Sequence, residues 1–129
     1  MAELQILERV LAESKKAFQE NKEAKKESWE ALKRLLGPYR RALYDLLGIE
    51  DVISGPHQLR FDGGIYYTIW WVDENGENIG SIEIPSLEAM RILLQKLVKL
   101  LEEKIHELSE ETNGLRELKN KIEEVTSHG

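Results

Sequence analysis

The chain has 129 residues, no cysteine and a formal net charge of −6, and 33% of its residues are charged. This length suits one domain with a modest core. The lack of cysteine excludes disulfides and thiolate chemistry and favours a reducing cytoplasm. No run approaches the roughly 18 apolar residues of a membrane span. We therefore expect a cytoplasmic protein without a membrane partner.

The start of the chain, M-A-E-L-Q-I-L-E-R, is acidic and amphipathic, unlike a signal peptide. Lys and Glu dominate the charged residues, which is typical of a thermophilic source. Charge is unevenly spread: Ser14–Arg41 has nine basic and four acidic residues, whereas Ala42–Leu87 has eight acidic residues and one Arg. Net acidity argues against indiscriminate duplex binding but allows a local basic track.

The N-terminal third is predicted to be helical. Its apolar residues recur at helical spacing from Leu4 to Phe18 and again from Trp29 to Leu36, with a polar stretch between them. This pattern fits either one long helix with a solvated middle or two helices with a joint. Gly37-Pro38 should end it, and a short second helix should run to about Leu47. Its inward residues are expected to be Leu43, Leu46 and Leu47.

A β-meander should follow. Ile65–Val72 is rich in aromatic and β-branched residues and predicts a strand. Asn75-Gly76 predicts a two-residue hairpin turn to a strand Asn78–Ile84, with Ile69 opposite Ile82 and Tyr67 opposite Ile84. The turn Asp62-Gly63-Gly64 connects an earlier strand, His57–Phe61, with Leu59 opposite Tyr67. Ile49–Gly55 leads into the sheet.

This register sorts the sheet into two faces. The expected core face carries Leu59, Phe61, Ile65, Tyr67, Ile69, Trp71, Ile82 and Ile84. The other, here called the mixed face, carries Gln58, Arg60, Tyr66, Thr68, Trp70, Val72, Ile79, Ser81 and Glu83.

The last helix should start after Ser86, whose side chain can cap it. Apolar residues then keep a 3-4 spacing to Val125, interrupted only by Lys104 and Glu111. From Leu108 the stripe narrows to the seam of a coiled coil, which predicts assembly into a homodimer or homotetramer. A helix that continues through Asn113-Gly114 is favoured, and a helical hairpin there is the alternative. The expected oligomerisation residues are Leu108, Leu115, Leu118, Ile122 and Val125.

The predicted fold is therefore α+β: N-terminal helices, a three- or four-stranded antiparallel meander and a long C-terminal leucine-zipper-like helix. We expect a helix–sheet–helix domain over residues 1–107 and an oligomerisation extension over residues 108–129.

Catalytic, metal and cofactor sites are not predicted. Glu103-x-x-His106 has the spacing of a di-iron ligand pair, but no second copy or facing carboxylates accompany it. A solvated helix face explains this pair better. No Gly-rich loop joins a strand to a helix to hold a phosphate.

The mixed face suggests nucleic-acid binding instead. Aromatic side chains stack bases and nearby cations follow the backbone of a single strand. Trp70 and Tyr66 would stack, with Arg60 on the next strand. The alternative is that the N-terminal helices cover this face and make it a second core. The further binding candidates are Tyr39, Arg40, Arg41, Lys33 and Arg34.

The helix-rich segment to Arg41, the aromatic strand Ile65–Val72 and the zipper Leu87–Val125 together resemble the layout of the archaeal single-stranded DNA-binding proteins called ThermoDBP. That resemblance implies a four-stranded sheet and sequence-independent binding of single-stranded DNA, or RNA, by an oligomer. Two other layouts are similar: a prefoldin-type coiled-coil chaperone subunit, and a YbaB-type nucleoid protein that binds duplex DNA.

Overall fold

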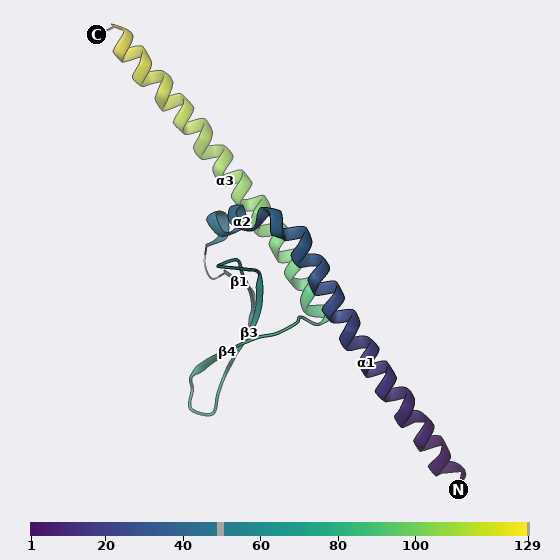
Figure 1. The fold of residues 1–129 in the computed structure, drawn as a ribbon. Coiled ribbons are helices and arrows are strands. Elements are labelled where there is room, and N and C mark those ends of the chain that lie inside the picture. The colour runs from purple at the N-terminus through teal and green to yellow at the C-terminus, as the bar shows by residue number, and fades with distance from the viewer. Residues whose placement is uncertain (49–50, 129) are drawn as a thin grey trace. The chain divides into compact units, whose positions relative to one another are not determined.

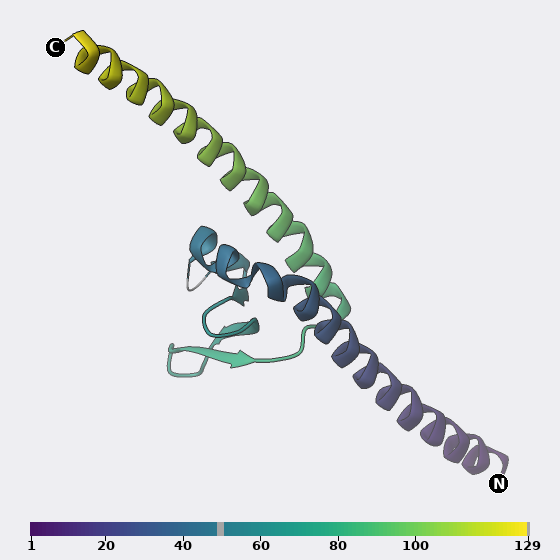
Figure 2. The same cartoon turned by 45° about the horizontal axis from the view of Figure 1, so that its top comes forward.

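The computed structural model describes residues 1–48 and 51–128 and has the predicted α+β fold. The chain divides into two compact units, Met1–Leu93 and Leu94–Gly129. Figure 1 shows the order of the elements, and Figure 2 shows the same chain turned. They are α1 (Ala2–Leu36), the 3-10 turn η1 (Gly37–Tyr39), α2 (Arg40–Leu47), β1 (Asp51–Ser54), β2 (His57–Arg60), β3 (Tyr66–Val72), β4 (Asn78–Ile82) and α3 (Leu87–His128).

The N-terminal segment is one continuous helix of 35 residues, so the alternative of two jointed helices is wrong. The helix ends at Gly37-Pro38 as expected, because Pro38 cannot donate a backbone hydrogen bond. The short helix α2 ends at Gly48, whose N–H donates the last helical hydrogen bond to the Tyr44 carbonyl at 2.8 Å. The positive φ of Gly48, 87°, then turns the chain out of the helix. Leu43 is buried, and Leu46 and Leu47 are half-buried.

The sheet has four antiparallel strands in the order β1-β2-β3-β4. The added strand is β1, from the segment that the sequence places only as a lead-in; residues 49–50 of that segment lie outside the described part. The β2–β3 register is confirmed, with Leu59 opposite Tyr67 and Arg60 opposite Tyr66.

The β3–β4 register is one residue away from the prediction. Ile82 lies opposite Thr68 rather than Ile69, and Gly80 lies opposite Trp70. The turn explains the shift. Within this turn Gly76 takes a positive φ, of 79°, but Asn75 does not, so Asn75-Gly76 does not form the two-residue turn that needs positive φ at both positions.

Asp73 sets the observed turn. Its carboxylate accepts hydrogen bonds from the backbone N–H groups of Asn75 and Glu77, each at 2.9 Å. Its own N–H bonds to the Glu77 carbonyl at 2.9 Å, which closes a longer loop with Gly76 in the left-handed position. A type I turn followed by a left-handed Gly has this form, and it favours Asp at its first position.

The prediction of burial in the core is wrong for three residues. Ile82 moves to the mixed face and is 63% exposed, and Ile84 is 45% exposed. Trp71 keeps its face but is 46% exposed, because the β3–β4 hairpin extends away from α1 and α2 (Figures 1 and 2). Predicted members of the core face near the sheet centre are buried as expected: Leu59, Phe61 and Tyr67.

The core of the first unit combines this centre with one face of each surrounding helix. Trp29 of α1 and Leu43 of α2 are each 5% exposed. Ala89 and Leu93, from the start of α3, are also buried. The N–H of Ala89 donates to the Ser86 hydroxyl at 3.2 Å, which confirms the predicted cap.

The helix α3 runs unbroken through Asn113-Gly114, so a helical hairpin at this point is wrong. Its predicted oligomerisation residues, from Leu108 to Val125, are exposed by 45–73%. Within the part of the chain that the structure describes, no helix combines the length and apolarity needed to cross a membrane.

Candidate nucleic-acid interface

Two shallow grooves adjoin between α1 and the sheet within the first unit. One, of about 420 Å³, is lined by Glu30, Lys33, Arg34, Arg40, Gly64 and Ile65. We call it the arginine groove. The other, of about 340 Å³, is lined by Lys26, Trp29, Glu30, Lys33, Ile65, Tyr66, Tyr67, Ile82, Glu83 and Ile84. We call it the tyrosine groove. They share Glu30, Lys33 and Ile65 and are therefore adjacent; the two together are here called the depression.

The depression carries more cations than anions. Three of the predicted cations, Lys33, Arg34 and Arg40, are brought together in the arginine groove. The tyrosine groove adds one further cation, Lys26. Among the described residues that line the two grooves, the carboxylates are Glu30 and Glu83 alone. This balance can attract an anion despite the net acidity of the chain.

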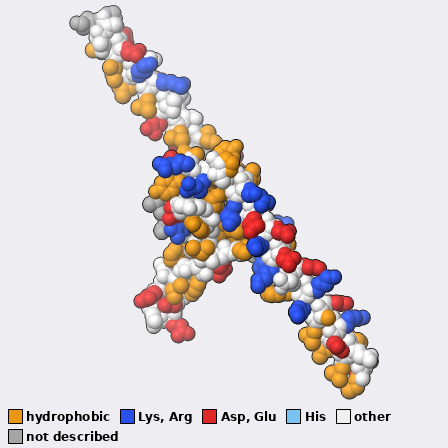
Figure 3. Space-filling view, viewed as in Figure 1, with side chains coloured by type: hydrophobic (Ala, Val, Ile, Leu, Met, Phe, Trp, Pro, Cys, Tyr) orange, Lys and Arg blue, Asp and Glu red, His pale blue; other side chains and the backbone are white. Residues whose placement is uncertain are grey.

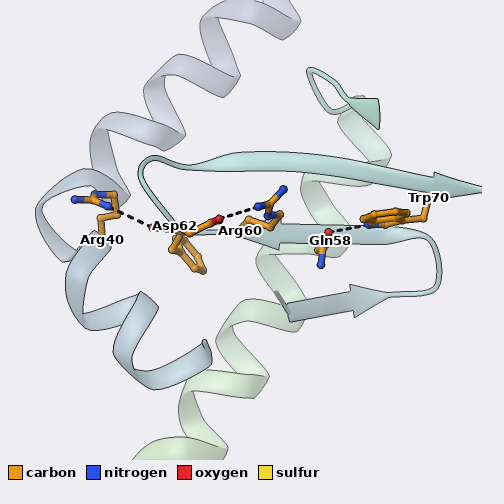
Figure 4. Close-up of polar contacts among 6 residues, drawn as sticks. Arg40, Gln58, Arg60, Asp62 and Trp70 are labelled. Atoms are coloured by element: carbon orange, nitrogen blue, oxygen red, sulfur yellow. Dashed lines mark hydrogen bonds and ion pairs between the residues drawn. The ribbon is translucent and has the colours of Figure 1, made fainter. Parts of the chain in front are cut away.

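Two of these cations are held by neighbouring groups. The Arg40 guanidinium donates a 3.4 Å hydrogen bond to the backbone carbonyl of Phe61, which ties α2 to the end of β2 (Figure 4). The Lys33 ammonium lies 6.0 Å from the centre of the Trp29 ring, at the outer limit of a cation–π contact.

Tyr66 supplies the exposed aromatic surface of the tyrosine groove. It is 37% exposed, and its ring lies directly over Gly64: a Cβ at that glycine would come within 2.8 Å of the Tyr66 hydroxyl. The shifted register of β4 also matters here, because it places Ile82 on the face of Tyr66. The groove therefore combines an aromatic ring with apolar side chains.

Trp70 lies on the same sheet face as Tyr66 but lines neither groove. Its indole N–H donates a 2.7 Å hydrogen bond to the Gln58 side-chain oxygen on β2 (Figure 4). On its other side, the ring lies over Gly80 of β4, where a Cβ would come within 2.9 Å of it. Trp70 is half-buried and fixed across the sheet.

Arg60 is a weaker candidate than the sequence suggests. Its guanidinium forms a 2.7 Å ion pair with Asp62 (Figure 4). This hydrogen bond holds the pKa of the Asp62 carboxyl below its ordinary value. Because the charge of Arg60 is already matched, little of it remains for a phosphate.

The structure does not bring Tyr39 and Arg41 into either groove. Tyr39 is 64% exposed on η1. Arg41 forms a 3.5 Å ion pair with Asp45 one turn along α2.

Sequence reasoning missed several lining residues of the tyrosine groove. Lys26 and Trp29 precede Lys33 by seven and four residues, a spacing that puts all three on one side of α1. This spacing could have been recognised in the sequence. Ile82 and Ile84 were missed because the turn was misassigned. Gly64 and Gly80 lie under aromatic rings, and their position there could not be predicted without the correct strand register.

Potential metal ligands do not gather in this structure. No group of three or more His, Cys, Asp or Glu side chains suited to a metal ion occurs among residues 1–48 and 51–128. The His106 ring instead pairs with Glu110 at 3.1 Å on the surface of α3. The ring of His57 bonds to the Tyr67 hydroxyl at 2.8 Å, and burial raises the pKa of Tyr67.

Comparison of this chain with known protein families, with curated proteins and with solved structures gives no match.

Proposed function

We propose that the protein binds single-stranded nucleic acid, without sequence preference, in the joined arginine and tyrosine grooves. The observation that carries this proposal is the placement of four cations in two adjacent grooves that hold one exposed tyrosine. Lys26 and Lys33 line the tyrosine groove with Tyr66, and Arg34 and Arg40 line the arginine groove beside it. Single-strand sites combine these two elements, cations along the backbone and aromatic rings under the bases.

Each groove would contribute one of these elements. The arginine groove offers guanidinium and ammonium groups from α1 and α2, which suit phosphate oxygens. The tyrosine groove offers the Tyr66 ring with Ile82 and Ile84 beside it, which suits an unstacked base. Every base has a π-face, so stacking of this kind tolerates any sequence.

The size and charge of the site favour a single strand over a duplex. Each groove is only 340–420 Å³, room for parts of a few nucleotides rather than a helix. The sheet beyond it is acidic, since no Lys or Arg occurs between Arg60 and Arg91. A duplex lying across unit one would meet those carboxylates.

The C-terminal part of α3 would join copies of the chain. Its seam residues Leu115, Leu118 and Ile122 are 53–57% exposed. Covering a large apolar side chain gains about 1.5–3 kcal/mol when burial is complete. A coiled coil between chains would cover them, and an oligomer would then present several grooves to one strand.

The test is a titration of labelled oligo-dT, followed by fluorescence anisotropy at several salt concentrations. Lys33→Gln with Arg34→Gln should weaken binding and make the log–log salt slope shallower by about 0.7 for each phosphate that is no longer neutralised. Arg41→Gln is the matched control, because Arg41 lies outside both grooves and already pairs with Asp45. We expect the control to stay near the wild type.

Two results would contradict the proposal. Absence of oligo-dT binding combined with suppression of protein aggregation would favour the chaperone alternative. Tighter binding to duplex than to single strands would favour a nucleoid role.

A further inference from the structure

A line of four lysines follows one side of α1. Lys15, Lys22, Lys26 and Lys33 are separated by seven, four and seven residues. At about 100° per residue, this spacing keeps them within a sector of roughly 40°. Because α1 is unbroken, the four form a line about 27 Å long, here called the lysine row. Lys26 and Lys33 line the tyrosine groove, so the row leads out of the groove toward the N-terminus.

The charges of the lysine row are not matched by neighbouring carboxylates. Elsewhere on α1, Arg9 pairs with Glu13 at 4.0 Å and Lys16 pairs with Glu20 at 3.9 Å. Among the residues that the structure describes, no member of the row lies within 4.0 Å of a carboxylate oxygen. Lys22 and Lys26 are four residues apart, where like charges destabilise a helix. A bound polyanion would relieve that repulsion.

Phe18 adds an exposed aromatic ring beside the row. It is 68% exposed, three residues after Lys15 and four before Lys22, and therefore next to both on the helix surface. Figure 3 shows Lys and Arg side chains spaced along α1. The combination repeats what the grooves offer: cations in line with an aromatic face.

We propose that the lysine row and Phe18 form a second subsite, which extends the path of the same strand along α1. This inference rests on the proposed function. The backbone would follow Lys26, Lys22 and Lys15, and a base would stack on Phe18. An acidic helix of another protein fits less well, because it would need a continuous apolar seam. Between Phe18 and Trp29 that side of α1 carries Asn21, Lys22 and Lys25.

Two lengths of oligo-dT separate the subsites in the full-length protein. A strand of about six nucleotides can occupy the grooves alone, and one of about 15 can also reach the row, within the usual range of single-strand sites. Phe18→Ala should weaken binding of the long strand by about 5- to 150-fold, the loss expected for one stacked base. Lys15→Gln with Lys22→Gln should lower its salt slope by about 1.4. Both variants should bind the short strand as the wild type does.

Two matched variants sharpen the test. Lys16→Gln removes the same charge on another side of α1, where Lys16 pairs with Glu20, and should leave long-strand binding unchanged. Phe18→Leu keeps an apolar side chain without the π-face and should behave like Phe18→Ala.

Four outcomes overturn the inference. If Lys16→Gln and Lys22→Gln weaken long-strand binding equally, then the net charge of the protein, and not the lysine row, controls the affinity. If the protein binds the short strand but the lysine-row variants bind the long strand as tightly as the wild type does, the proposed function stands and this subsite is ruled out. A lower mass of Phe18→Ala in light scattering would show that Phe18 contacts another copy of the chain. Failure of the wild type to bind either strand overturns the proposed function as well.

Discussion

The indole nitrogen of Trp70 donates a 2.7 Å hydrogen bond to the side-chain oxygen of Gln58, across the β2–β3 ladder. Gln58 is only 2% exposed, so its oxygen has little access to water. The bond therefore satisfies a buried acceptor and fixes the plane of the largest ring on the mixed face. Trp70 has a structural role in addition to any role in binding.

We expect strong coupling between these two residues in stability. Gln58→Leu leaves the indole N–H without its acceptor, and Trp70→Phe leaves the Gln58 amide without its donor. Each should lower the free energy of unfolding by about 1–3 kcal/mol. The double variant should lower the free energy of unfolding by less than the sum of the two single losses. Urea unfolding of the four proteins measures this, and simple additivity would mean that the bond contributes nothing.

The two adjacent tryptophans of β3 should differ in strand binding. Trp70 shares its face with Tyr66, whereas Trp71 lies on the opposite face beside Ile79. We expect the strand to continue past the tyrosine groove and a base to stack on Trp70. Trp70→Ala should then lose about 1–3 kcal/mol of oligo-dT affinity, with a similar loss for other base compositions. Trp71→Ala should bind as the wild type does. Equal affinity of both variants would restrict the site to the two grooves.

Trp29 rather than Trp71 should be the tryptophan that stabilises the fold. Trp29 is 5% exposed and Trp71 is 46% exposed. Trp29→Ala should leave a cavity and cost about 3–5 kcal/mol, while Trp71→Ala should cost far less. Thermal melting of both variants compares them directly. An equal loss for Trp71→Ala would show that the hairpin face is covered in solution.

Element types and the β2–β3 register could be predicted because they depend on local patterns. The helical spacing of α1, the stop at Gly37-Pro38 and the aromatic strand are all visible in the sequence. The β3–β4 register depended on one turn. Asn-Gly fits two different hairpin loops, and the carboxylate of Asp73 selects the longer one. A shift of one residue then moves every β4 side chain to the other face.

The candidate site could be predicted only where local sequence patterns determine it. Lys33, Arg34 and Arg40 were identified from local charge and lie together. Arg60 was identified from charge too, but its pairing with Asp62 is a contact that spacing alone did not reveal. Exposure of Trp71 depends on how far the hairpin reaches past the helices, which no local pattern encodes.

The Arg60–Asp62 pair should make stability depend on pH. Its hydrogen bond lowers the pKa of the folded Asp62 carboxyl below the ordinary 3.8. The stabilisation is therefore complete above the unfolded pKa and is lost as pH falls through the lower, folded pKa. The difference in free energy of unfolding between the wild type and Asp62→Asn should be constant above about pH 5 and shrink toward pH 2. A constant difference down to pH 2 would mean that the pair is not formed in solution.

Assembly through α3 gives the last prediction. Removal of the residues after Thr112 deletes four of the five predicted seam residues, Leu115, Leu118, Ile122 and Val125, which are 53–73% exposed in the single chain. We expect the truncated protein to show a lower mass in light scattering, because its coiled-coil partner surface is gone. In the full-length chain, Leu115→Ala with Leu118→Ala should have the same effect. Asn120→Ala, which lies off the seam, is the matched control and should keep the wild-type mass. An unchanged mass after truncation would place self-association elsewhere on the chain.

Loss of assembly should also weaken binding to long oligo-dT more than to short oligo-dT, because linked copies raise the effective concentration of grooves along one strand.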